Sequence, residues 1–229
     1  MAKPALKEIS VMTISASYLV HFTGTLENLK GILESGFMAN LCEEQIIFKE
    51  HVTSFFVPMV SFCDIPLSKI SKHAEKYGKY GIGMTKTWGE SNKINPIIYL
   101  KRGSLLSSAL QASIKSSIET INKLSDSKSE ISEENLISSR ITSFIKNYDA
   151  DNKSGRYHKG YKFYDEKEWR FVPSETNDNI PILPHYFADM TTDKLANEIR
   201  KIKLGFDPKD VRYIIVEKED EIIEMIKII

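Results

Sequence analysis

The sequence has almost no net charge. Its 31 Lys and Arg residues match 31 Asp and Glu residues over 229 positions, and the sequence pI is about 7.0. Proteins that bind nucleic acid without sequence preference use a broad basic surface to attract the phosphate backbone. The charge balance therefore excludes that class of protein and leaves room only for a local contact with nucleic acid.

Long apolar runs and cysteines are also scarce. No apolar stretch approaches the roughly 20 residues that cross a bilayer, and no basic segment followed by an apolar one opens the sequence. We therefore expect a cytoplasmic protein with no membrane partner. Cys42 and Cys63 are too few and too far apart for a disulfide framework, a CxxC pair or a cysteine-only zinc site. We expect two buried thiols.

Motifs for metals and phosphates are missing as well. His51 and His73 have no companion at ligand spacing, so we expect no metal. A metal-dependent nuclease has little support, because no third carboxylate accompanies Glu166 and Glu168 at a convincing spacing. The glycines between residues 78 and 83 match neither the Walker A motif nor the dinucleotide-binding fingerprint.

The patterns that are present predict one α+β domain over residues 1–229. Residues 18–23 are aromatic and β-branched enough for a strand. Thr25 can cap a helix that Gly36 ends. Further strands are expected within residues 53–65, 80–87, 96–100 and 167–172, and Pro58 indicates either an edge position or a strand that begins after it. An amphipathic helix is expected to close the chain.

The character of the sequence changes at Gly103. Leucines and isoleucines recur at helical spacing from Leu106 to Ile121, and a second helical stripe runs from Leu136 to Tyr148. A polar, serine-rich segment separates the two. Residues 103–148 therefore predict a helical hairpin inserted between strands of the sheet.

Three segments carry groups capable of chemistry. Strand alternation places His21 and Thr23 on one face, where a ring nitrogen and a hydroxyl can bind two hydroxyls of a sugar. Taken alone, however, the motif more often contains a hydrogen-bonded structural histidine. Alternation also aligns Glu166, Glu168 and Arg170, either as an acidic site that stabilises oxocarbenium-like charge or as a solvated charged face.

The third segment contains Ser61, which could support a carboxylate by hydrogen bonding, although a structural role explains most of its surroundings. A basic loop over residues 153–162 interleaves lysines and Arg156 with tyrosines. Such a loop could dock nucleic acid or an acidic protein, or be only solvated.

The order of several segments resembles the AbiGi family, antitoxins of bacterial abortive-infection systems against phage. The resemblance covers about residues 18–217 and rests on these segments: Leu19-Val-His-Phe-Thr-Gly24, Leu29-Lys-Gly-Ile-Leu-Glu-Ser-Gly-Phe37, Pro58-Met-Val-Ser-Phe-Cys-Asp-Ile-Pro-Leu-Ser68, His73, Tyr77-Gly-Lys-Tyr-Gly-Ile-Gly-Met84, Asn95-Pro96 and Glu166-Lys-Glu-Trp-Arg170. It implies a role in phage defence, with a cognate toxin or defence protein as partner.

The same order is more distantly similar to ADP-ribosyltransferases. That similarity implies a split, mixed β-sheet that binds NAD between its halves. It implies that His21 and Thr23 bind ribose beside Phe22, that Ser61 is the second-strand residue, and that Glu168 is the catalytic glutamate. Glu166 would orient the acceptor, and either Tyr77 or Tyr80 would stack on nicotinamide. The Ser-Thr-Ser triplet of those enzymes is absent from the expected strand.

Two functions follow from these resemblances. In the first, the protein is an NAD-dependent mono-ADP-ribosyltransferase of a phage-defence system and modifies a macromolecular acceptor. In the alternative, it is a non-enzymatic antitoxin that neutralises a partner toxin by protein–protein binding, with the helical hairpin as the docking element.

Overall fold

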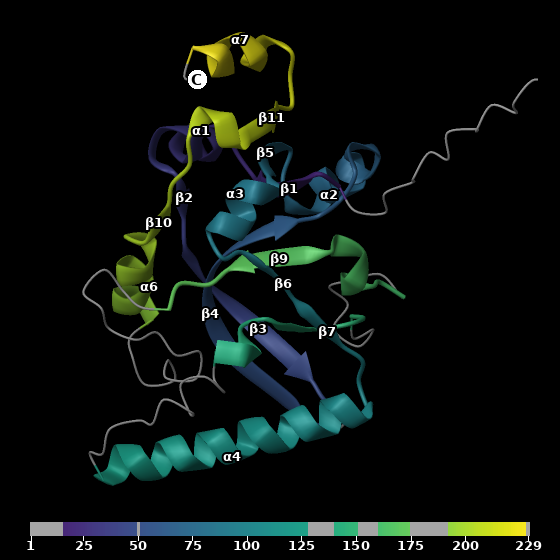
Figure 1. The fold of residues 1–229 in the computed structure, drawn as a ribbon, viewed down its shortest axis with the longest axis vertical. Helices are drawn as coiled ribbons and strands as arrows, with labels where there is room; N and C mark the ends of the chain where they lie inside the picture. Colours follow the sequence, from purple (N-terminus) through teal and green to yellow (C-terminus); the bar gives the residue numbers. More distant parts are fainter. Residues whose placement is uncertain (1–15, 50, 128–139, 151–159, 175–191, 228–229) are drawn as a thin grey trace, which may run out of the picture.

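A computed structural model describes residues 16–49, 51–127, 140–150, 160–174 and 192–227. A seven-stranded antiparallel sheet forms its centre, in the order β11-β5-β1-β4-β9-β6 with β3 also paired to β4 (Figure 1). The strands are β1 (Tyr18–Thr23), β3 (Asn40–Ile47), β4 (Val52–Cys63), β5 (Tyr80–Thr85), β6 (Asn95–Pro96), β9 (Glu168–Phe171) and β11 (Val211–Ile215). Two small sheets pair β2 (Phe37–Met38) with β10 (Lys203–Leu204), and β7 (Ile98–Leu100) with β8 (Ile145–Asn147). The α+β class is confirmed.

The unit at the start of the described chain forms as the sequence predicts. Thr25 caps α1 (Leu26–Ser35) by accepting a hydrogen bond from the Asn28 backbone N–H at 3.2 Å. Gly36 ends the helix at φ +83°, a conformation that favours glycine. A Cβ on Gly36 would stand 2.7 Å from the Leu204 carbonyl oxygen, so this glycine also lets α1 approach β10.

Strand β4 is long enough to serve two hydrophobic cores. Its first half pairs with β3, and its second half lies between β1 and β9. Pro58 stands within the strand, opposite Leu41 of β3, where the described strand β9 has not yet begun to pair with β4. Around Pro58 the strand therefore has a described partner on one side only, which confirms the predicted edge position. The alternative prediction, a strand that begins after Pro58, is wrong, because β4 begins at Val52.

The two cores lie at different ends of the molecule. The larger one packs the helices α1, α3 (Lys86–Ser91), α6 (Thr192–Arg200) and α7 (Asp220–Ile226) on the sheet, around Phe37, Phe62 and Trp88. The smaller one packs Ile114 of α4 (Leu105–Ser127) against β3, β4, β7 and β8. Figure 1 shows α4 across the end of the molecule opposite α7.

The predicted helical hairpin is wrong in its second half. Helix α4 forms as expected, and residues 128–139 lie outside the described residues. Residues 140–142 are helical, but Ile145–Asn147 is strand β8, which pairs in parallel with β7. The apolar positions Phe144 and Ile145 follow helical spacing only by coincidence, because Ile145 is buried in the smaller core as a strand residue. Among the described strands, β7 and β8 form the parallel pair. The seven-stranded sheet is antiparallel, whereas the sequence predicted a mixed sheet.

The remaining short elements connect these layers. The 3-10 turn η1 (Leu67–Lys69) leads into α2 (Ile70–Tyr77), and η2 (Phe163–Glu166) leads into β9. Another, η4 (Pro208–Asp210), precedes β11. Lys167 takes a left-handed conformation at φ +45°, so β9 begins at Glu168 and not at Lys167 as predicted. In the described residues, no helix is both long and apolar enough to span a membrane.

Gly78 should tolerate no side chain. It ends α2 at φ +123°, and a Cβ there would lie 2.1 Å from the Thr23 carbonyl oxygen. Gly78→Ala combines backbone strain with a clash against β1, so we expect a loss of about 2–4 kcal/mol in the free energy of unfolding, measured by urea denaturation. Gly24→Ala is the matched control, because a Cβ on Gly24 meets nothing within 4 Å. Equal stability of the two variants would contradict this account of the α2–β5 connection.

Candidate functional site

The sheet separates the predicted site residues by face. Val20 and Phe22 of β1 share one face with Ser61 and Glu168, because Val20 pairs with Cys63 and Cys63 pairs with Glu168. His21 and Thr23 alternate with Val20 and Phe22 along β1 and lie on the other face. Two separate cavities result, one on each face, and the residues that the similarity to transferases would bring together line different ones.

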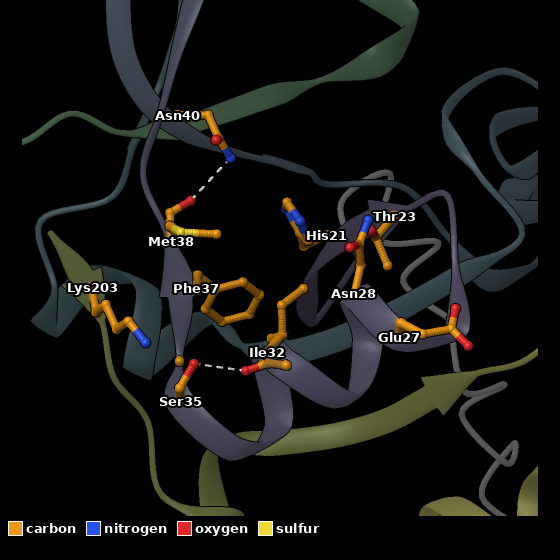
Figure 2. A pocket seen from close by; sticks show the side chains of 12 residues that line it. His21, Thr23, Glu27, Asn28, Ile32, Ser35, Phe37, Met38, Asn40 and Lys203 are labelled. Atoms are coloured by element: carbon orange, nitrogen blue, oxygen red, sulfur yellow. Dashed lines mark hydrogen bonds between the residues drawn. The ribbon is translucent and has the colours of Figure 1, made fainter. Parts of the chain in front are cut away.

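The first cavity, named here the α1 pocket, has a volume of about 340 Å³ (Figure 2). His21 and Thr23 line it together, as the sequence predicts for a sugar-binding pair. The other lining residues are Glu27, Asn28, Gly31, Ile32, Ser35, Gly36, Phe37, Met38, Asn40 and Lys203.

His21 is held in one orientation. Its Nδ1 lies 2.8 Å from the Ser61 carbonyl oxygen, an acceptor, so Nδ1 carries the hydrogen. The ring packs edge-on against Phe37, with ring centres 5.2 Å apart. Burial lowers the pKa of His21 and outweighs the opposing effect of the Ser61 hydrogen bond, so the ring is neutral at pH 7. A neutral ring with its hydrogen on Nδ1 offers Nε2 as an acceptor.

The second cavity, named here the β4 cleft, has a volume of about 210 Å³. It collects five of the predicted site residues: Phe22, Ser61, Tyr77, Glu166 and Glu168. Its other lining residues are Val20, Cys42, Glu44, Met59, Cys63 and Lys146. Tyr77, and not Tyr80, lies at this cleft. The Tyr80 hydroxyl instead donates to Glu221 of α7 at 2.9 Å.

A cluster of six charged side chains lies at the β4 cleft, and four of them, Glu44, Lys146, Glu166 and Glu168, line it. This charged cluster pairs three carboxylates with three cations: Glu44, Glu166, Glu168, Lys76, Lys146 and Arg170. Arg170 is fully buried, and Glu166 and Glu168 are 3% and 5% exposed. The interpretation of these residues as a solvated charged face is therefore wrong. Buried charges persist when they are paired and hydrogen-bonded.

Both carboxylate oxygens of Glu168 are engaged. Oε1 accepts from Arg170 Nε at 2.6 Å, and Oε2 accepts from Lys146 Nζ at 2.9 Å. The guanidinium of Arg170 also donates to the Ser143 carbonyl oxygen at 2.7 Å and to Glu44 at 3.0 Å. Burial opposes ionisation of Glu168, but the two cations outweigh it and lower its pKa. Glu168 is thus an ionised ion-pair partner fixed between two cations.

Glu166 is held by a different set of donors. Its Oε1 accepts from Lys76 at 2.8 Å and from the hydroxyls of Tyr77 and Tyr161, and its Oε2 accepts from Lys146 at 3.2 Å. Burial favours the protonated acid, but Lys146 and these hydrogen bonds prevail and lower the pKa of Glu166 to about 2. The residue stands at the end of η2 and not on strand β9, where alternation had placed it.

The low pKa of Glu166 predicts acid sensitivity. A carboxylate with a folded-state pKa of about 2 and an unfolded pKa of about 4.5 stabilises the fold above pH 4.5. That stabilisation is lost as pH falls from 4.5 towards 2, and at 1.36 kcal/mol per pKa unit it amounts to about 3 kcal/mol. The free energy of unfolding, measured by urea denaturation, should therefore fall more steeply over this pH range for the wild type than for Glu166→Gln.

The exposed carboxylate Glu219 provides the control for this pH dependence. Glu219→Gln should leave the slope of unfolding free energy against pH as it is in the wild type. A wild-type slope that Glu166→Gln does not reduce would show that Glu166 is not the group responsible.

Sequence reasoning found Arg170 but missed the two lysines of the charged cluster. Lys146 lay in a predicted helix, and Lys76 belonged to none of the three segments singled out for chemistry, so nothing in the spacing pointed to either. The described residues contain no group of three or more His, Cys, Asp or Glu side chains that could hold a metal ion. Cys42 and Cys63 are free and half-buried, and burial raises the pKa of both thiols. Of the predicted basic loop, residues 151–159 lie outside the described residues.

Comparison with known proteins gives a consistent result. Residues 35–217 match the family model described as "Putative abortive phage resistance protein AbiGi, antitoxin". The chain is 32% identical over 199 residues to the abortive phage resistance protein AbiGi of Lactococcus lactis subsp. cremoris. The match covers 76% of this chain and 78% of that protein. No solved structure matches the chain.

Proposed function

Because the chain belongs to the AbiGi family, we propose that it is the antitoxin of a bacterial abortive-infection system and neutralises a partner toxin by binding it. The family match over residues 35–217 is the observation that carries this proposal. The partner is then a toxin or another component of the same phage-defence system. No turnover of a small molecule is needed for such a role.

The geometry of the predicted catalytic residues supports binding over transfer. A transferase would need His21 and Glu168 on one bound dinucleotide, but the two line different cavities on opposite faces of the sheet. Each oxygen of Glu168 also carries an ion pair, one with Arg170 and the other with Lys146, so a ribose hydroxyl would have to share an oxygen with a cation. NAD-dependent ADP-ribosyl transfer has no support from these contacts and stays a prediction from sequence.

The start of α4 is the proposed docking element. Leu105 and Leu106 are 87% and 57% exposed, adjacent to each other in the first turn. Ser104 fixes this turn, since its hydroxyl accepts from the Ser107 backbone N–H at 3.1 Å. Ile114 anchors the helix in the smaller core. Two large apolar side chains on a fixed helix end are the kind of exposed feature that a protein partner covers.

Co-expression tests this proposal. The protein encoded beside this chain in its genome is expressed alone and together with the chain, and growth of the bacterial host is recorded. We expect growth arrest by the partner alone, rescue by the chain, and no release of nicotinamide from NAD by the purified chain. Release of nicotinamide that Glu168→Gln abolishes would favour the transferase instead.

A further inference from the structure

The α1 pocket is open because a glycine stands in the middle of a helix. Gly31 is the sixth of the ten residues of α1, where glycine is about 0.5–1 kcal/mol less favourable than alanine. Its φ is not positive, and a Cβ there would meet no atom within 4 Å, so neither backbone conformation nor packing requires a glycine. A side chain at this position would project into the pocket, which Gly31 lines. The glycine therefore keeps the cavity empty.

The polar groups of the pocket define what it can hold. His21 offers an acceptor at Nε2, because Nδ1 donates to the Ser61 carbonyl oxygen. Thr23 follows on the same face of β1, and its hydroxyl both donates and accepts. Figure 2 shows Thr23, Asn28 and Glu27 together at one side of the pocket. Three neighbouring acceptors and an amide that both donates and accepts suit a ligand with several hydroxyl groups.

The opposite side of the pocket carries a positive charge. Lys203 of β10 is exposed, and within the described part of the chain it pairs with no carboxylate. Figure 2 shows it across the pocket from Thr23 and Asn28. Strand β10 pairs with β2, and Lys203 stands opposite Met38 in this pairing. The small sheet therefore fixes the position of Lys203 on the rim of the pocket. An unpaired ammonium group at that place attracts an anionic substituent.

We propose that the α1 pocket binds a small sugar phosphate, with the sugar hydroxyls at His21 and Thr23 and the phosphate towards Lys203. The volume of about 340 Å³ lies at the lower end of the range for small-molecule sites, which suits a pentose phosphate unit. This unit could be a free sugar phosphate or one half of a dinucleotide such as NAD. The inference does not depend on the antitoxin proposal, because it concerns a cavity at the opposite end of the molecule from the first turn of α4.

Isothermal titration calorimetry with the full chain tests the inference. The probes are ribose 5-phosphate, ADP-ribose, NAD and inorganic phosphate. We expect ribose 5-phosphate to bind more tightly than inorganic phosphate, by tenfold or more. Tighter binding of ADP-ribose or NAD than of ribose 5-phosphate would identify the dinucleotide as the source of the unit. Equal binding of ribose 5-phosphate and inorganic phosphate, or no binding of any sugar phosphate, would overturn the proposal.

Two variants and a control locate the site. Gly31→Leu should fill the pocket, and His21→Phe should remove the acceptor while keeping a ring against Phe37. Each should weaken ribose 5-phosphate binding by about tenfold or more. Glu34→Leu adds the same side chain to an exposed position of α1 that does not line the pocket, and should bind as the wild type does. Circular dichroism monitors folding. If Gly31→Leu does not fold, Gly31→Ser takes its place, and unchanged affinity in a folded pocket variant contradicts the inference.

Discussion

Replacing Arg170 by methionine is expected to lower the free energy of unfolding by about 3–5 kcal/mol. Arg170 is fully buried and ties together Glu168, Glu44 and the Ser143 carbonyl oxygen. Methionine fills much of the same volume, but it removes the ion pair of Glu44 and leaves Glu168 with Lys146 alone. The penalty of an uncompensated buried charge, and not lost packing, dominates the effect. Urea denaturation at neutral pH measures it.

Lys101→Met is the matched control for this substitution. Lys101 pairs with Asp149 at 2.6 Å, but its side chain is 61% exposed. Exposed ion pairs contribute about 0–1 kcal/mol, so the control should lie close to the wild type. If Arg170→Met were as stable as Lys101→Met, the charged cluster would not be a major determinant of the fold.

Replacing both Leu105 and Leu106 by aspartate should abolish toxin neutralisation. The two side chains are exposed, so the change removes apolar contact area without opening a cavity in a core. Aspartate in the first turn of a helix is favourable, because it opposes the positive end of the helix dipole. Host growth on co-expression with the toxin is the measurement, and we expect growth arrest as if the antitoxin were absent.

Ser113→Asp controls for added negative charge on α4, because Ser113 is exposed on the same helix about two turns beyond Leu106. It should still neutralise the toxin. Substitution is a sharper test than deletion of residues 103–148, which would also remove Lys146 from the charged cluster and Asn147, whose amide binds the Ile47 backbone at 2.8 and 3.0 Å. Rescue of growth by the double variant would exclude the first turn of α4 as the docking element.

Local patterns in the sequence predict much of the fold. The strand over residues 18–23, the Thr25 cap, the Gly36 stop, the first helix after Gly103 and the closing helix all form. Each depends on residues close together in the chain, whose propensities and capping groups one sequence displays. Strand β8 escaped prediction because its three residues are defined by pairing with β7, far away in the sequence, and not by their own spacing.

The candidate site was predicted in parts and not as a whole. Alternation placed His21 with Thr23 and Glu168 with Arg170 on shared faces, as the structure has them. Alternation could not show which face of β1 lies on the same side of the sheet as which face of β9. That relation depends on the register of β4, the strand between them, in which Cys63 pairs with both Val20 and Glu168. That register puts His21 and Glu168 on opposite sides of the sheet, which the sequence alone does not reveal.

Titration of the purified toxin with increasing amounts of this chain tests the central claim most directly. An antitoxin that acts by binding must be present at about one copy per toxin molecule, if the complex is one to one, and it works without NAD. We therefore expect toxin activity to fall linearly and to vanish near equimolar antitoxin, with no effect of added NAD. Complete neutralisation by a small fraction of an equivalent, dependent on NAD, would contradict the account and show that the protein acts as an enzyme.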